Sequence, residues 1–293
     1  MEQHPTDFGR RLREAAENQG LTVGMLTSAE LAHNLALVFH LAEGPPLLRL
    51  RHKEWTVETR DIEGVYCGID MFPASLWEAF SAKDAEYAAQ ETQALWLGVL
   101  ASLPCRVVNP PALDTLAGTV LSSPEILYLA HRLGFRIPTV ADVESGELAA
   151  QALGKGVMAT YADLGELWEQ SMLRTKNELR ECRNHIRILE KVRGRPVWAA
   201  VLDDQFFPSQ VSLGGSIEPL PEYDLPVSIR SRLRVLQSRL NLDLAEYAFH
   251  ITANGTWVFS ECTRVPVHAV AAYGYQLLQK IVEAIAGKGG TSW

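Results

Sequence analysis

The sequence predicts an α/β fold of the mixed, α+β kind, with a partly antiparallel sheet. Strand-like and helix-like segments are interspersed through the first 110 residues, as in a small α/β domain. The amphipathic stretch 226–240 repeats apolar residues at helical spacing. A β-hairpin follows it, with strands over 247–252 and 256–262 around the turn Ala253-Asn254-Gly255.

The N-terminal part is predicted to alternate between helices and strands. Capped or amphipathic stretches indicate the helices, and short apolar runs indicate the strands. In chain order we expect a helix over 6–20, a strand over 22–26, a helix from Ser28 through Val38, strands over 47–51, 54–60 and 64–69, a helix over 81–101 and a strand over 105–108.

The middle and C-terminal parts are predicted in the same way. Ser122-Ser123-Pro124 begins a helix that ends at Arg132, because serine caps helices and proline favours the first turn. Further on we expect a strand over 156–160, a helix over 163–168, a solvated polar helix or loop over 172–187, a hairpin of strands 186–192 and 196–202, a strand over 206–213 and a helical segment over 265–286. Three domains are expected, over 1–110, 111–195 and 196–293.

Composition excludes several classes of partner. The chain has 293 residues, a net charge of −8 and a pI of about 5.5, so no basic excess attracts nucleic acid or an anionic membrane. Its apolar runs are far shorter than the roughly 18 residues of a membrane span, and no signal core opens it. The four cysteines are scattered and suggest neither zinc nor disulfides. We expect a cytoplasmic protein.

The hairpin ends in a carboxylate that is a candidate site residue. Glu261 stands near the end of a buried-looking strand, before a loop that contains Pro266. A metal ion or a catalytic acid often occupies such a position. The alternative is an edge-strand glutamate in solvent.

Three stretches together resemble the ATP-grasp superfamily, and within it the microviridin-type (graspetide) ligases that mature ribosomally made peptides. They are CRVVNPPALDTLAGTVLSSPEILYLAHRLGFRIPTV, ILEKVRGRPVWAAVLDDQFFPSQV, and the hairpin with its preceding helix. The resemblance covers most of the chain from about Ile62. It implies an ATP-grasp-like fold, in which an N-terminal α/β domain precedes a two-part ATP-grasp domain with a reduced central lid.

The resemblance also implies chemistry that this chain departs from. Such ligases use ATP and magnesium to activate a carboxylate, with two lysines and an arginine at the phosphates and carboxylates and an asparagine at the metal ions. Ser123 stands where the family has the first lysine, and Lys155 lies at the wrong end of the second lysine's strand. Trp198 replaces the arginine, while Ala248 and Thr263 replace two metal ligands.

Two family positions are retained or compensated. Glu261 matches the remaining metal ligand, and Glu190 matches the hinge carboxylate that receives the nucleotide. Arg264, beside Glu261, is expected either to form an ion pair with it in place of the metal or to point to solvent. Without the lysines, a site has little to hold the negative charge of Mg-ATP.

Three functions stay open. The first is a non-catalytic pseudoenzyme that needs no cofactor and binds a peptide or protein partner, such as an active ATP-grasp ligase or another maturation enzyme. The second is an active ATP-dependent ligase that forms amide or ester bonds, with its charges relocated to Lys155, Lys176, Arg180, Arg183 and Arg187 and with Glu246 near the lost ligand.

The third is a different use of the vacated cleft. It would draw on His185, His250, His268 and Cys262, although buried core roles are the favoured interpretation of these residues. A homodimer is expected by analogy alone.

Overall fold

The computed structural model describes residues 7–40, 47–53, 55–113, 115–119, 121–143, 157–161, 186–190, 192–212, 214–221 and 225–287. The chain forms two compact units. The first spans 1–120, 198–246 and 263–293, and the second spans 121–197 and 247–262. The three domains expected from the sequence stay a prediction.

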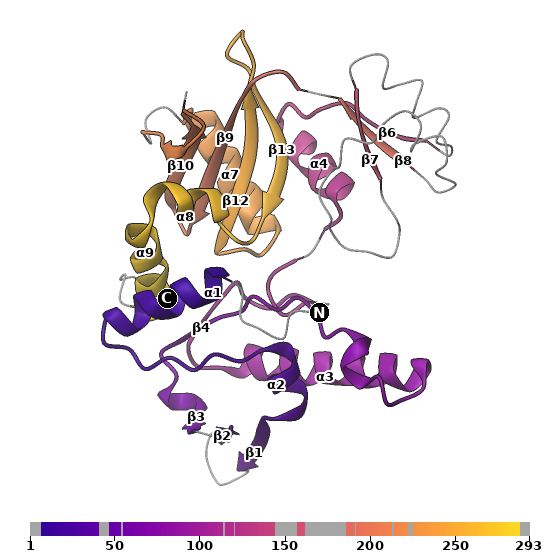
Figure 1. Ribbon diagram of the computed structural model, residues 1–293, viewed down its shortest axis with the longest axis vertical. Helices are drawn as coiled ribbons and strands as arrows, with labels where there is room; N and C mark the ends of the chain where they lie inside the picture. Colours follow the sequence, from indigo (N-terminus) through magenta and orange to yellow (C-terminus); the bar gives the residue numbers. More distant parts are fainter. Residues whose placement is uncertain are drawn as a thin grey trace. The chain divides into compact units, whose positions relative to one another are not determined.

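The N-terminal part of the first unit contains a three-stranded antiparallel sheet and a parallel strand pair (Figure 1). The sheet has the order β1-β2-β3, and β4 pairs with β5. The elements are α1 (Asp7–Asn18), α2 (Ser28–His33), β1 (Ala36–His40), β2 (Leu47–Arg51), β3 (Thr56–Glu58), β4 (Gly64–Tyr66), α3 (Ala82–Ser102) and β5 (Arg106–Val108), with short 3-10 helices over Thr59–Asp61 and Ala74–Trp77.

A five-stranded sheet contains the predicted hairpin. Its order is β11-β10-β9-β12-β13, and β9, β12 and β13 each contribute residues to both units. The strands are β9 (Arg195–Leu202), β10 (Gln205–Val211), β11 (Ile217–Pro219), β12 (Leu244–Ile251) and β13 (Trp257–Thr263). Figure 1 shows α7 (Val227–Arg239) running along this sheet, and Ile229, Leu233 and Leu236 are its buried apolar residues.

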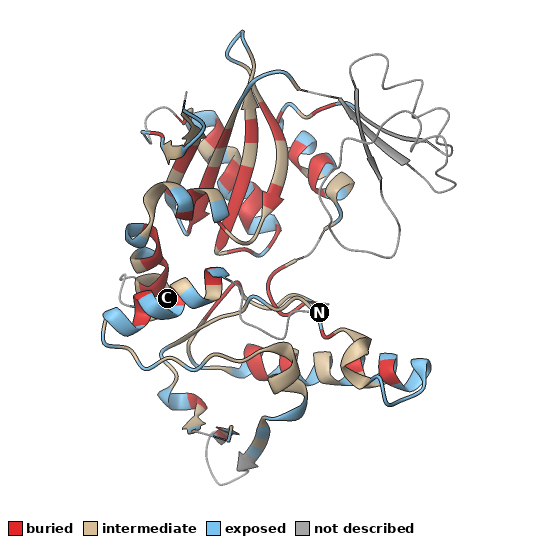
Figure 2. Cartoon of the chain, in the orientation of Figure 1, coloured by how far each residue is buried: buried red, intermediate tan, exposed pale blue. Residues whose placement is uncertain are grey.

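Two apolar clusters form the core of the first unit (Figure 2). One joins α1 to the C-terminal helices α8 (Val267–Tyr273) and α9 (Tyr275–Ile285), and includes the buried strand residues Val108, Leu202 and Leu244. The other joins β2, α3 and β5 around Trp96. Burial of these apolar side chains is the main favourable contribution to folding of the unit.

The second unit contains α4 (Ser123–Arg132) and a three-stranded antiparallel sheet. This sheet has the order β6-β8-β7, formed by β6 (Val140–Val143), β7 (Val157–Tyr161) and β8 (Ile186–Glu190). Phe135, Phe249 and Phe259 pack with ring centroids 5.5–5.9 Å apart, which is within the range of favourable aromatic pairs.

Two predictions near the N-terminus are wrong. Residues 22–26 form no strand, and the helix begun at Ser28 ends at His33 instead of continuing through Val38. Thr27 caps this helix in a capping box with Glu30. The residues after it form β1, because pairing with β2 overrides the local helical pattern.

The predicted hairpin over 186–192 and 196–202 is also wrong. Both strands exist, but β8 pairs with β6 and β7, whereas β9 pairs with β10 and β12. Gly194 lies between them, where a Cβ would come within 2.7 Å of the Ile251 carbonyl oxygen. The C-terminal helix is divided at Gly274, whose φ of 57° interrupts helical geometry.

Candidate functional site

The second unit holds two of the positions that the family resemblance singles out. Ala248 lies on β12 and Glu261 on β13, and both are half-buried. The carbonyl oxygen of Ala248 accepts a hydrogen bond from Ser260 Oγ at 3.1 Å. The methyl side chain of Ala248 cannot ligate a metal, so a site here would have only the Glu261 carboxylate from these two positions.

In the first unit, Thr263 is the last residue of β13, and Arg264 follows it. Thr263 Oγ1 donates to the Val265 carbonyl at 3.1 Å. The Arg264 guanidinium pairs with Asp70 and donates to the Ala117 carbonyl at 3.0 Å. Arg264 therefore contributes to the structure of its own unit. The expected pair between Arg264 and Glu261 stays a prediction.

Glu246, His268 and Trp198 form a cluster that sequence reasoning named only as separate residues. The Glu246 side chain is 2% exposed, and its two oxygens accept the backbone N–H groups of Ala269 at 2.7 Å and His268 at 3.2 Å. One of these oxygens also lies 2.8 Å from His268 Nδ1. The His268 ring stacks on Trp198, with centroids 3.9 Å apart and planes 7° apart.

The cluster occupies positions that matter in the resembled family. Trp198 stands where the phosphoryl-binding arginine is expected, and Glu246 precedes Ala248 by two residues on the same face of β12. Both Glu246 oxygens already bind the start of α8. The arrangement therefore offers an oriented imidazole and an aromatic face, in place of a cation and a metal ligand.

The remaining predicted site residues do not join this cluster. Ser123 is the first residue of α4, whose cap is Ser122 in a capping box with Glu125. Glu190 ends β8, where its backbone pairs with Val157, and nothing is described of its side chain. Lys155, Lys176, Arg180, Arg183 and His185, together with the predicted helix over 163–168, lie outside the described residues, and Arg187 is described by its backbone alone.

His250 and Cys262 were the candidates for a different chemistry. Burial lowers the pKa of His250, and its Nδ1 is buried with no hydrogen-bond partner within the described part of the chain. Cys262 is buried. Their use as a catalytic pair stays a prediction. Among the described residues, no three His, Cys, Asp or Glu side chains gather where they could hold a metal ion.

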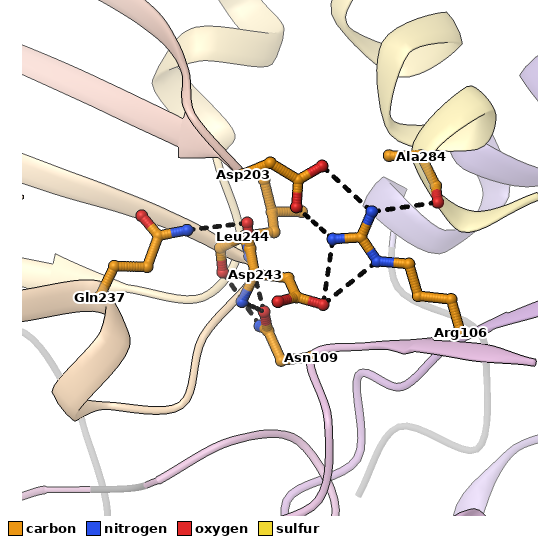
Figure 3. A network of polar contacts seen from close by, with 7 residues as sticks. All are labelled: Arg106, Asn109, Asp203, Gln237, Asp243, Leu244 and Ala284. Atoms are coloured by element: carbon orange, nitrogen blue, oxygen red, sulfur yellow. Dashed lines mark hydrogen bonds and ion pairs between the residues drawn. The ribbon is translucent and has the colours of Figure 1, made fainter. Parts of the chain in front are cut away.

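A second polar network in the first unit was missed by sequence reasoning (Figure 3). Asn109, only 1% exposed, accepts the backbone N–H groups of Asp243 at 2.8 Å and Leu244 at 2.7 Å, and donates to the Leu244 carbonyl at 3.0 Å. Gln237 donates to the Asp243 carbonyl at 2.8 Å. In the sequence, Asn109 stands before two prolines, and its partners are too distant along the chain to leave a local signal.

Arg106 completes this network. It pairs with Asp203 and with Asp243, the latter at 3.1 Å, and donates to the Ala284 carbonyl at 3.2 Å (Figure 3). Burial raises the pKa of the Asp243 carboxyl, and the Arg106 charge opposes that rise. The network thus joins β5, the turn after β9, the start of β12 and the end of α9.

No family model and no curated protein match this chain, but solved structures do. The macrocyclase MdnC of Microcystis aeruginosa MRC, bound with precursor peptide MdnA, is 15% identical, with a TM-score of 0.69 over 97% of each chain. Macrocyclase MdnB from the same organism is 18% identical, with a TM-score of 0.63 over 96% of this chain and 94% of that one.

A third structural match is a RiPP-associated ATP-grasp ligase of Chryseobacterium gregarium, solved in complex with ADP and a leader and core peptide. It is 16% identical, with a TM-score of 0.64 over 96% of this chain and 93% of that one. These matches confirm the predicted fold: the chain has the mixed α/β, ATP-grasp-like fold of these proteins over nearly its full length. None of the described helices is long and apolar enough to cross a bilayer.

Proposed function

We propose that this chain binds a ribosomally made precursor peptide on an ATP-grasp-like scaffold. The observation that supports this most is the extent of the structural match. Proteins solved with precursor, leader or core peptides share the fold over 96–97% of this chain. Peptide handling is common to these solved relatives, and it does not require each nucleotide-binding position to be kept.

A second, finer proposal is that the chain is an ATP-dependent ligase that forms an ester or amide bond in its peptide. The structural likeness to a ligase solved with ADP and peptide favours it. ATP would activate a carboxyl group when bound, and the relocated cations proposed from the sequence would face its phosphates. Glu261 would then be the residue of this chain that holds magnesium.

A third proposal is that the chain binds peptide without catalysing a reaction, and the residues of the site support it. Ala248 and Trp198 offer neither a metal ligand nor a cation, and Thr263 donates its hydroxyl to its own loop. Both oxygens of Glu246 accept backbone N–H groups at the start of α8, and one of them also contacts the His268 ring. In this form the chain presents peptide to an active ligase or to another maturation enzyme, as an accessory protein or a homodimer.

One experiment separates these proposals. Any short peptide encoded beside this gene would be titrated into the protein by calorimetry, with and without Mg-ATP, and the mixture then analysed by mass spectrometry. Binding supports the first proposal. Loss of one water per bond formed, abolished in Glu261→Ala, supports the ligase. Binding with neither water loss nor any effect of Mg-ATP supports the non-catalytic form, and absence of peptide binding would overturn the proposed function.

A further inference from the structure

Helix α7 carries a concentration of positive charge in a chain that is acidic overall. Its 13 residues include four arginines and neither aspartate nor glutamate, whereas the whole chain has 27 lysines and arginines against 35 acidic residues. Oppositely charged residues three or four positions apart stabilise a helix, and like charges at that spacing destabilise it. The arginines of α7 therefore do not stabilise their own helix through such pairs.

The outward face of α7 is a narrow strip of valine and serine. Val227, Ser231, Val235 and Ser238 are spaced by four, four and three residues, so they lie on one side of the helix, opposite the buried Leu233. All four are exposed, Val227 by 68% and Val235 by 45%. Valine is a poor helix former and gains nothing from contact with water. The strip thus offers apolar side chains, with small serines between them where another backbone can approach.

The arginines flank this strip on both sides. At about 100° per residue, Arg230 and Arg234 fall on one side of it, and Arg232 and Arg239 on the other. Arg230 and Arg232 are half-buried and already interact within the protein. Arg234 pairs with Asp204 at 2.7 Å, and Arg239 is exposed. The side chains of the Arg234–Asp204 pair are 49% and 84% exposed, and such a pair is weak enough for another carboxylate to replace Asp204.

We propose that the outward face of α7 is a docking surface for an acidic amphipathic helix of a partner protein. The valines would pack against apolar side chains of that helix, and Arg234 and Arg239 would pair with its carboxylates along both edges, as flanking charges do in paired helices. The exposed valines favour a protein over nucleic acid, whose phosphate backbone has no apolar side chains to meet them. The proposal goes beyond peptide binding on the ATP-grasp-like scaffold and does not depend on it.

A synthetic acidic helix tests the charged edges. The fluorescent probe has about three heptads, with leucine at a and d and glutamate at e and g, and its binding to the full chain is followed by anisotropy at low salt. We expect saturable binding that weakens as salt is added, because exposed charges are screened. Arg234→Gln combined with Arg239→Gln should weaken binding about tenfold, since two charge pairs are lost. The same probe with lysine in place of glutamate should not bind.

Val235→Ser tests the apolar strip separately from the charges. It removes apolar contact area and leaves every arginine in place, so we expect binding of the acidic helix to weaken about threefold. Binding of duplex DNA, measured in the same way, should be far weaker in the wild type and should not respond to Val235→Ser. A face that only attracts negative charge would show the opposite: DNA would bind at least as well as the peptide, and Val235→Ser would change neither affinity.

The matched control removes the same charge from another exposed helix. Arg10→Gln combined with Arg13→Gln on α1, where both side chains are about half-exposed or more, should bind the acidic helix like the wild type. Urea unfolding of each variant shows that it is folded. Absence of saturable binding by the wild type, equal losses from the α1 and α7 variants, or an inert Val235→Ser would each overturn the inference. None of these outcomes affects the proposed peptide binding.

Discussion

The first unit contains two polar clusters that both combine charged and uncharged side chains. They differ in whether a polar side-chain atom stays accessible to a ligand. In the network around Asn109 and Arg106, these two side chains bind backbone or opposite charge, and Asn109 is almost wholly buried. Within the described part of the chain, the buried Oε1 of Gln237 is the atom of this network that has no hydrogen-bond partner. In the cluster around Glu246, the carboxylate is just as buried, yet His268 keeps one nitrogen open. A closed network stabilises the fold, and an open one leaves a group available to a ligand. This difference, more than burial or charge, separates the two clusters.

The largest effect is expected from Asn109→Ala. The substitution removes the side-chain partner of two backbone N–H groups and one hydrogen bond to the Leu244 carbonyl. Since each unsatisfied buried group costs about 1–3 kcal/mol, we expect a loss of about 4 kcal/mol in the free energy of unfolding, measured by urea denaturation. Asn18→Ala, at the exposed end of α1, is the matched control and should be nearly neutral. Similar losses for both variants would show that the network is not the cause.

Gly64→Ala tests the packing beside the same network. Gly64 pairs with Arg106, and a Cβ there would clash with the backbone of Ile285, whose carbonyl carbon would lie only 2.7 Å away. Backbone cannot move aside as a flexible side chain can, so we expect a loss of about 3 kcal/mol, at the upper end for overpacking. Thermal or urea unfolding measures it.

Gly98→Ala is the matched control, and we expect it to raise the free energy of unfolding. Gly98 lies in α3, and nothing is within 4 Å of a Cβ built there. Alanine in a helix is more favourable than glycine, so the variant should gain about 0.5–1 kcal/mol. Destabilisation by both substitutions would argue against close approach as the reason for Gly64.

Local patterns predicted those elements whose pattern is complete in one stretch of chain. The hairpin of β12 and β13 and helix α7 repeat their apolar residues at strand or helix spacing, and both are present. β1 and the separate sheets of β8 and β9 were missed or misassigned, because pairing with distant strands decides them. The site follows the same rule. Trp198, Glu246 and His268 were each noted in the sequence, but only the tertiary fold brings them together.

Arg106→Ala should destabilise the protein by about 2 kcal/mol at neutral pH, since the two ion pairs it removes, with Asp203 and Asp243, are only partly buried. The deficit should depend on pH. Burial already raises the folded-state pKa of Asp243, and without Arg106 it rises further. A raised carboxyl pKa means that the folded state holds the proton more tightly, so its stability falls as pH rises from about 4, the unfolded value.

The deficit of Arg106→Ala should therefore be smallest in acid and grow toward neutral pH, as urea unfolding at a series of pH values would show. Adding Asp243→Asn removes the titrating group and should flatten this dependence. A deficit that stays constant with pH, or that grows toward acid, would contradict the proposed coupling between Arg106 and Asp243.

The smallest change in stability is expected from His268→Asn, in the cluster around Glu246. His268→Asn keeps a donor for Glu246, and the two backbone N–H groups that bind this carboxylate remain. We expect the free energy of unfolding to change by less than about 1 kcal/mol, the net value of one hydrogen bond. A His268→Asn protein as unstable as Asn109→Ala would instead make His268 part of a closed, structural network.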